Sequence, residues 1–556
     1  MTDMRPPSQV MRLSRMGSAH QTRLSFMRVL LRGLRRGGWQ VDCPLWQIDT
    51  QGVGRAVYRV RGQGQCYSLV AFAHDLPDEL RSDRVIAEAW DATFVLVDGE
   101  PTANDLNRLA RNVPLQEAGR VSDKELVLSR ANRSARLWNY VVDCLASGHQ
   151  PDARQLADVG YLMRTTAVYG SGKFGAADRA ALSGRGLMDG PFRAEMLAVW
   201  LIRTFVCDLV EHVAMAKGGT TAVSLDRTLR RSLGIGNSTG LGMAPFLVNH
   251  PALLNAWITA RETALARVLD LPLASSDTRA AFAQALAGAR VLHANWQTDH
   301  PLQKEKLGDL ENDLRQLTDQ VASTGLAGTY PWRGLWQWAS KALSEEGQEL
   351  ALSLMLEPHG PLVDDLADEM AADELHSMRV DGTMALDELK VGIDAHFGWA
   401  LTPDYTDETA SALFWYVSKA KLEPRLGQRY QEPGAHLEQP LDIGRSIASL
   451  VDEIIKQPLH LTVAEFLQFH PQHRRAVRRI QLARTAPYGE IQDNLLAADT
   501  LPIDMLRCKL AFFGATRFDP RSDRWVRITM YQNAPFPDEL HALPEDAWSL
   551  PVPDAA

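Results

Sequence analysis

Residues 192–217 have the sequence FRAEMLAVWLIRTFVCDLVEHVAMAK, in which apolar side chains recur at the spacing of an α-helix. One half of the helical wheel carries Val199, Ile202, Phe205, Val206, Leu209, Val210 and Val213. The other half carries Arg203, Thr204, Cys207, Asp208, Glu211 and His212. If both halves are buried, these polar groups must pair or contact a ligand. If the polar half faces solvent, we expect an Asp208–His212 contact at four-residue spacing.

Helical periodicity continues on the C-terminal side of this segment, at Pro251–Leu271, Asp277–Val291 and Gln303–Ser323. On its N-terminal side, residues 39–97 alternate short apolar runs with glycine-bearing turns, which predicts an antiparallel meander. We therefore predict a small N-terminal α+β domain over residues 1–115 and a predominantly α-helical body over residues 120–400.

The remaining residues, 401–556, are predicted to form a mixed C-terminal region. Leu510–Phe518 and Arg524–Tyr531 flank a Pro- and Asp-containing turn, which predicts a C-terminal β-hairpin whose strands could complete the N-terminal sheet. The expected fold is thus α+β overall, with the helical body as its largest part.

A basic amphipathic helix is predicted just before the meander. Its cations are Arg23, Arg28, Arg32, Arg35 and Arg36, and no acidic residue lies nearby in the sequence. We expect its apolar side to pack on the sheet and its arginines to be solvated. An interfacial or targeting helix is the alternative.

Two glycine-rich stretches interrupt the helical pattern: Tyr169-Gly-Ser-Gly-Lys-Phe-Gly175 and Gly234-Ile-Gly-Asn-Ser-Thr-Gly-Leu-Gly242. Glycine is costly inside a helix, so the backbone there needs another shape. Such runs can direct several backbone N–H groups at one point, which suits a carboxylate or a phosphate. We predict that the two stretches meet as walls of one pocket for a small anionic metabolite.

The candidate site residues follow from this hypothesis. The predicted substrate-binding residues are Ser171, Gly172, Gly236, Asn237, Thr239, Gly240, Arg425 and Arg429. The predicted catalytic residues are Tyr169, Lys173, His212, Ser238 and His250, with Lys173 neutralising the anion and Tyr169, His212 or His250 transferring a proton. The structural alternatives are a solvent-exposed loop for Lys173, surface ion pairs for the two arginines and a helix cap for His250.

Familiar motifs match only in part. Gly236–Gly240 has the Gly-x-Ser-x-Gly spelling of a nucleophile elbow, but the residues before it are predicted to be helical instead of a strand. Ser238 is therefore expected to act as a hydroxyl or backbone donor, and a helix-ending turn is the structural alternative. The stretch ending at Lys173 lacks the spacing of a nucleotide-binding loop.

Composition limits the remaining possibilities. The chain has 556 residues, of which 45% are hydrophobic, and this is enough for a sizeable core. A net charge of −9 argues against nucleic acid as a partner. Charged residues interrupt the apolar stretch Met196–Met215, so no transmembrane segment is expected. The five cysteines are widely spaced, which favours reduced thiols and a cytoplasmic location.

The leading functional hypothesis is an enzyme with lyase, isomerase or hydrolase chemistry, without an assigned cofactor or metal and with a homo-oligomer as a possible assembly. The first alternative is a noncatalytic helical interaction or regulatory protein. The second is magnesium-dependent diphosphate chemistry at Asp364, Asp365 and Asp368, which have the spacing of a helical metal-binding motif.

Overall fold

The structure is a computed structural model that describes most of the chain. The described residues are 4–5, 7–10, 15, 17–77, 90–114, 122, 124–165, 186–188, 190, 192–238, 251–296, 298, 301–369, 382–402, 404–406, 415–418, 424–426, 438–441, 443–474, 476–477, 502–515, 517–519 and 527–551.

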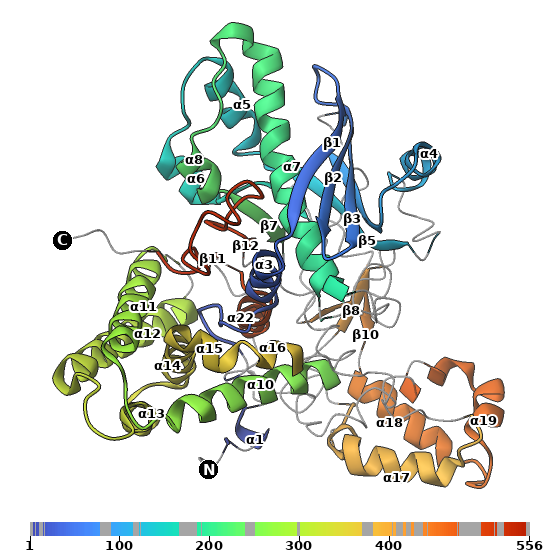
Figure 1. Ribbon diagram of the computed structural model, residues 1–556. Helices are drawn as coiled ribbons and strands as arrows, with labels where there is room; N and C mark the ends of the chain where they lie inside the picture. Colours follow the sequence, from blue (N-terminus) through green and yellow to red (C-terminus); the bar gives the residue numbers. More distant parts are fainter. Residues whose placement is uncertain are drawn as a thin grey trace.

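A large, mostly antiparallel sheet forms one half of the molecule (Figure 1). Its nine described strands lie in the order β1-β2-β3-β4-β5-β6-β7-β12-β11. Their bounds are β1 Gln40–Ile48, β2 Gly54–Gly62, β3 Gln65–Ala73, β4 Ala92–Asp98, β5 Glu125–Arg133, β6 Tyr161–Thr165, β7 Gly234–Ser238, β11 Arg517–Asp519 and β12 Arg527–Met530. Strands β1 to β4 pair antiparallel in chain order, which is the meander that the sequence predicts.

Helices cover both faces of this sheet. Helix α7, Arg193–Gly218, crosses one face and packs on β3 to β7, with α3, Phe26–Arg36, beside it. The opposite face forms a separate apolar cluster with α4, Ala103–Asn112, through Leu109 and Val113. Three short helices, α5 Trp138–Ala146, α6 Ala153–Val159 and α8 Arg227–Ser232, complete this half. Helix α7 confirms the prediction made from residues 192–217.

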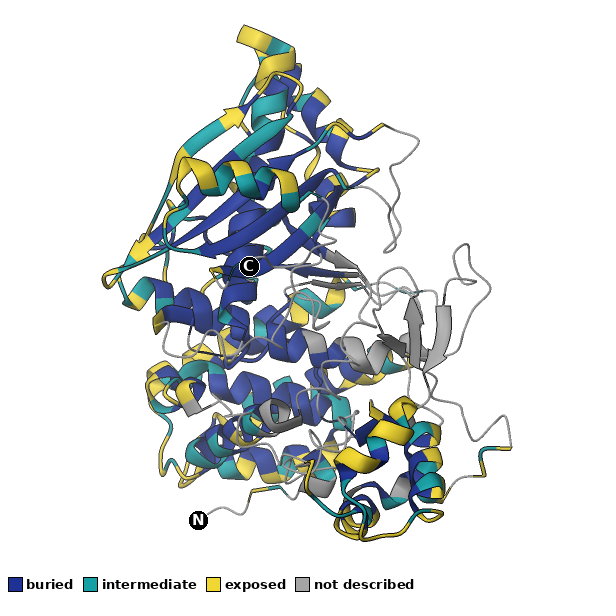
Figure 2. Ribbon diagram, turned by 90° about the vertical axis from the view of Figure 1, so that its right-hand side faces the viewer, coloured by how far each residue is buried: buried dark blue, intermediate teal, exposed yellow. Residues whose placement is uncertain are grey.

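A helical body lies against the end of the sheet. Its helices are α10 Pro251–Leu269, α11 Ser276–Ala294, α12 Pro301–Thr324, α13 Pro331–Ala342, α14 Glu345–Leu356, α15 Gly360–Val363 and α16 Leu366–Glu369. Figure 2 shows buried residues continuing from the sheet through α7 into this body. Trp257 and Trp332 are among its largest fully buried side chains. Helices α10, α11 and α12 confirm the periodicity found in the sequence.

The C-terminal part contributes to several places in the fold. Helices α17 Leu386–Phe397, α18 Ile443–Ile454 and α19 Val463–Phe469 form a lobe, and α22, Pro502–Phe513, packs against α3. A small sheet has the order β10-β8-β9, with bounds Glu438–Leu441, Trp415–Ser418 and Pro424–Leu426. At the N-terminus, α1 spans Pro7–Val10.

The predicted fold class is wrong in two respects. The sheet does not belong to a small N-terminal domain, because it takes β7 from the middle of the chain and β11 and β12 from near its end. The predicted C-terminal hairpin also fails, because residues from Leu510 to Phe513 are the last part of α22. The short strands β11 and β12 belong to the large sheet instead of an independent hairpin: β12 pairs with β7, and β11 is the edge strand. The apolar residues of α22 matched a strand pattern because short apolar runs fit either period.

Three arginines of the predicted basic helix, Arg23, Arg28 and Arg32, are not solvated as predicted, whereas Arg36 is exposed. Arg28 is fully buried and binds Glu357 at 2.7 Å, and Arg32 binds Asp546 at 2.7 Å. Arg23 binds Asp364 at 2.7 Å. Their carboxylate partners are distant in sequence, so the local sequence contains no sign of them. These buried ion pairs tie α3 to the helical body and to the C-terminal residues.

Candidate functional site

Strands β6 and β7 are neighbours that run parallel, whereas the other paired strands of the large sheet run antiparallel. Their register pairs Tyr161 with Gly234 and Arg164 with Gly236. The carboxyl ends of the two strands, Thr165 and Ser238, therefore lie side by side at one edge of the sheet. Residues that follow either strand leave from this shared edge.

Helix α7 connects the two strands and crosses one face of the sheet. Near its C-terminus, His212 bonds through Nε2 to the carbonyl oxygen of Asp49 at 2.8 Å, in the turn between β1 and β2. That turn lies at the far side of the sheet, five strands away from β6, in the row that runs through Gly54, Ala73, Ala92 and Ala131 to Thr165. Helix α7 lies between β6 and β7 in the chain and packs on both strands. Strand β6, helix α7 and strand β7 thus form a βαβ crossover.

The chain order places both glycine-rich stretches at this crossover. The first lies in sequence between β6 and α7, and the second begins in β7 and continues beyond its carboxyl end. Several predicted site residues lie outside the described residues: Tyr169, Ser171, Gly172, Lys173, Thr239, Gly240, His250 and Arg429. Their grouping stays a prediction that rests on the parallel pairing of β6 and β7.

Residues Gly234–Ser238 form a strand, not the turn expected from their glycines. A side chain at Gly234 would place its Cβ 2.4 Å from the carbonyl oxygen of Met530 in β12. At Gly236, the Cβ would lie 2.7 Å from Cγ atoms of both Tyr161 and Arg164 in β6. These glycines therefore allow β7 to fit between its two neighbours.

Because β7 is a strand, the Gly-x-Ser-x-Gly pattern lies in a different structural context from the one predicted. Helix α8 is present where the sequence predicts it, but β7 separates it from Ser238, which ends the strand opposite Arg527 of β12. A nucleophile elbow requires a strand before the serine and a helix directly after it. The first requirement is met, and the second falls on residues 239–250, outside the described residues.

His212 is not brought together with Ser238. It contacts β1, which five strands separate from β7, and the indole N–H of Trp46 donates to its Nδ1 at 3.3 Å. Since Nδ1 accepts, Nε2 carries the proton that is donated to Asp49. Both ring nitrogens therefore connect α7 to β1 and to the turn that follows it, which is a structural role.

The other polar residues of α7 are enclosed and paired. Asp208 accepts hydrogen bonds from the Tyr58 hydroxyl and from Arg230, and does not make the expected contact with His212. Burial raises the pKa of Asp208, and the Arg230 cation opposes that rise. Burial and the Asp208 carboxylate raise the pKa of Tyr58 well above its usual value. This cluster holds β2, α7 and α8 together.

Arg203 is a second buried polar group on α7. Its three nitrogens donate to the carbonyl oxygens of Leu233 at 2.7 Å, Ala534 at 2.9 Å and Arg231 at 3.0 Å. Burial lowers the pKa of Arg203 to about 10. Arg203 thereby fixes the backbone just before β7, so it positions the strand that carries Ser238.

The predicted cation sites in the C-terminal region are only partly described. Arg425 belongs to β9 of the small sheet, and its side chain lies outside what the structure describes. One cation that the sequence analysis missed is Arg164, which lies in β6 one residue before Thr165 and contacts the backbone position of Gly236. Its place became visible only through the parallel register of β6 and β7, which no local pattern in the sequence encodes.

The aspartates of the magnesium hypothesis do not converge. Asp364 binds Arg23 and Arg36, Asp365 binds Arg267, and Asp368 binds Arg193 at 3.3 Å. Asp364 and Asp365 lie in the turn between α15 and α16, so the three carboxylates do not share one helix face. Within the described residues, no group of His, Cys, Asp and Glu side chains has the arrangement of a metal site.

Comparisons with protein-family models, with curated proteins and with solved structures gave no match. Within the described part of the chain, no helix combines the length and the apolar character needed to cross a bilayer.

Proposed function

We propose that the protein is a cytoplasmic enzyme that binds a small anionic metabolite, a carboxylate or a phosphate, at the carboxyl edge of β6 and β7. One observation supports this proposal: the two strands are parallel neighbours joined through α7, and both glycine-rich stretches are connected to their shared carboxyl edge. In sheets with βαβ crossovers, ligands bind outside the carboxyl ends of the strands where neighbouring connections diverge.

The chemistry of the edge suits an anion. Backbone N–H groups of a glycine-rich stretch can converge on an oxyanion. Lys173 follows β6 in sequence, and Arg164 adds a second cation within that strand. The hydroxyl of Ser238 and the rings of Tyr169 and His250 are the remaining candidates for proton transfer. Lyase, isomerase and hydrolase reactions all fit this set.

The cytoplasmic part of the proposal rests on cysteine chemistry. All five cysteines are described, and each is a free thiol: Cys43, Cys66, Cys144, Cys207 and Cys508. Burial raises the pKa of Cys207 to about 11, so this thiol stays protonated at neutral pH. Protonated, separated thiols are compatible with a reducing compartment.

A ligand screen by thermal unfolding tests the proposal. Phosphorylated and carboxylated metabolites are added to the wild-type protein and to the Lys173→Ala and Ser238→Ala variants. A true ligand at one hundred times its Kd stabilises the wild type by about 2.7 kcal/mol. We expect both variants to lose most of that stabilisation while keeping the unfolding temperature of the ligand-free wild type.

Lys217→Ala is the matched control, because Lys217 is an exposed lysine at the other end of α7, paired with Asp143. It should respond to the ligand as the wild type does. If no metabolite stabilises the wild type, or if Lys217→Ala weakens the response as much as Lys173→Ala, the proposal is wrong. A noncatalytic interaction protein would then be the better hypothesis.

A further inference from the structure

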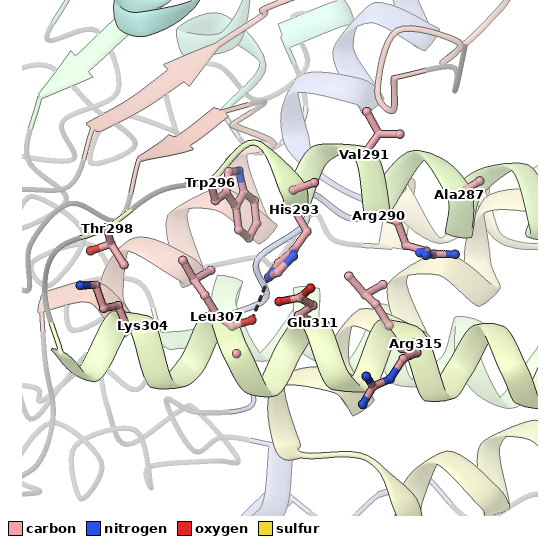
Figure 3. A pocket seen from close by; sticks show the side chains of 13 residues that line it. Ala287, Arg290, Val291, His293, Trp296, Thr298, Lys304, Leu307, Glu311 and Arg315 are labelled. Atoms are coloured by element: carbon pink, nitrogen blue, oxygen red, sulfur yellow. Dashed lines mark hydrogen bonds between the residues drawn. The ribbon is translucent and has the colours of Figure 1, made fainter. Parts of the chain in front are cut away.

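A groove lies between α11 and α12, far along the chain from the β6–β7 edge. The two helices are consecutive, and together they line an open groove of about 920 Å³ (Figure 3). Its lining residues are Ala287, Arg290, Val291, His293, Ala294, Trp296, Thr298, Lys304, Leu307, Gly308, Glu311, Leu314 and Arg315. The volume lies in the range of about 300–1,000 Å³ that is typical of small-molecule sites.

Part of the groove is apolar. Trp296 follows the end of α11 and is half-buried, with its ring centroid 5.7 Å from that of His293. Leu307 and Leu314 of α12 line the facing wall. Val291 is more than one-third exposed although it is a large hydrophobic side chain. This combination offers a flat aromatic surface and aliphatic walls to an apolar ligand body.

The charge of the groove is positive, in contrast to the net charge of −9 on the whole chain. Arg290, Lys304 and Arg315 line it, and Glu311 is the single carboxylate among the lining residues. Arg315 donates to the amide oxygen of Asn312 at 2.6 Å, which is a neutral partner. Arg290 and Lys304 have no carboxylate partner within the described part of the chain. The cationic excess is therefore available to a ligand.

His293 closes the groove without adding a fixed charge. Its Nε2 donates to the carbonyl oxygen of Leu307 at 3.0 Å and so links α11 to α12. Burial lowers the pKa of His293, an effect that the Leu307 carbonyl and the Glu311 carboxylate oppose. Arg290 and Arg315 are therefore the side chains that carry a permanent positive charge at one end of the groove. Figure 3 shows Arg290 from α11 and Arg315 from α12 at that end, and Trp296 toward the other.

We propose that this groove is a binding site for an amphipathic organic anion, whose apolar body lies against Trp296 and Leu307 and whose acidic group is held by Arg290 and Arg315. One guanidinium comes from each helix, and a guanidinium can bind the two oxygens of an acidic group bidentately. The site is independent of the β6–β7 edge, and its ligand is a small molecule because the cavity has the size of one.

The aromatic sulfonate 1-anilinonaphthalene-8-sulfonate is a direct probe, and N-phenyl-1-naphthylamine is the same aromatic body without the charge. Fluorescence titration of the full chain should give one saturable sulfonate site, with the uncharged analogue at least tenfold weaker. The Arg290→Ala/Arg315→Ala double variant should raise the Kd of the sulfonate at least tenfold. Its affinity for the uncharged analogue should not change.

Arg227→Ala serves as the control, because Arg227 is an exposed arginine of α8, in the other half of the molecule. Its sulfonate Kd should equal that of the wild type. Circular dichroism of the double variant checks that the helices are retained, since both arginines are exposed and their removal should leave the fold intact. An unchanged sulfonate Kd in the folded double variant, or an equal loss in Arg227→Ala, overturns the proposal.

Discussion

His20 shows how a single buried side chain can make the stability of this protein depend on pH. Its imidazole is only 2% exposed, and Nδ1 donates to the carbonyl oxygen of Gln21 at 2.6 Å. The buried Nε2 has no hydrogen-bond partner among the described residues. Burial lowers the pKa of His20 and Arg28 lowers it further, whereas Glu357 and the Gln21 carbonyl oppose the shift. Protonation would place an unpaired charge at Nε2, so the folded state holds His20 neutral.

A depressed pKa has a defined consequence for stability. The contribution of neutral His20 is present above the unfolded pKa of about 6.5 and is lost as the pH falls below it. We expect the free energy of unfolding to decrease between pH 7.5 and pH 5.5, with His20 contributing up to about 1.4 kcal/mol per pH unit below 6.5. Urea unfolding of the wild type and His20→Gln at several pH values measures this slope, which should be shallower in the variant.

His149→Gln provides the comparison, because His149 is exposed. Its slope should match that of the wild type. If His20→Gln has the same pH dependence as the wild type, His20 is not the group that titrates.

Glycine illustrates what the sequence could not provide at the scale of one residue. Gly234 and Gly236 indicated correctly that the helix must stop, because glycine is unfavourable in a helix. Their purpose was not visible, because the atoms that exclude a side chain belong to Met530 and Thr529 of β12 and to Tyr161 and Arg164 of β6. In the sequence, a glycine that distant strands require looks the same as a glycine that a turn requires.

At the scale of elements, α3 contains a buried and an exposed arginine whose energetic roles should differ. Arg28 has a fully buried side chain and binds both Glu357 and Asp546. The side chain of Arg36 is 54% exposed and binds Asp364 and Glu545. Loss of a buried cation leaves its carboxylates buried without a partner, whereas an exposed ion pair contributes little.

We predict that Arg28→Met lowers the free energy of unfolding by about 3–5 kcal/mol. Arg36→Met, on the same helix, should lower it by less than about 1 kcal/mol. Urea unfolding at pH 7 measures both values. Equal effects of the two substitutions would contradict the role of α3 as a buried ionic link to the helical body.

The elements also differ in how well they could be predicted. Helices α7, α10, α11 and α12 were found because their apolar residues repeat within the element itself. The pairing of β7 with β6 and β12 was not found, because each partner is separated from it by a long stretch of chain. The candidate site depends on that pairing. Sequence could propose that two glycine-rich stretches meet, but the parallel strands that support their meeting required the structure.

For the whole molecule, the C-terminal residues are a part of the core and not an appendage. Strand β12 pairs with β7 along Ile235–Ser238. The hydroxyl of Tyr531 donates to the carbonyl oxygen of Met196 at 2.9 Å, and the indole of Trp200 donates to that of Pro535 at 2.8 Å. Residues from the end of the chain thus close the hydrophobic core around α7, the helix that connects β6 with β7.

This arrangement predicts the effect of truncation. A chain that ends at residue 501 lacks α22, β11 and β12, so it exposes an edge of β7 and leaves the buried face of α7 without its cover. We expect this chain to be largely insoluble and to show no cooperative thermal unfolding. Co-expression with a separate fragment of residues 502–556 should restore a soluble complex, seen by size-exclusion chromatography, because the same strand pairing can form between two chains. A truncated chain that stays soluble and unfolds at the temperature of the full protein would show that the core closes without its C-terminal strands.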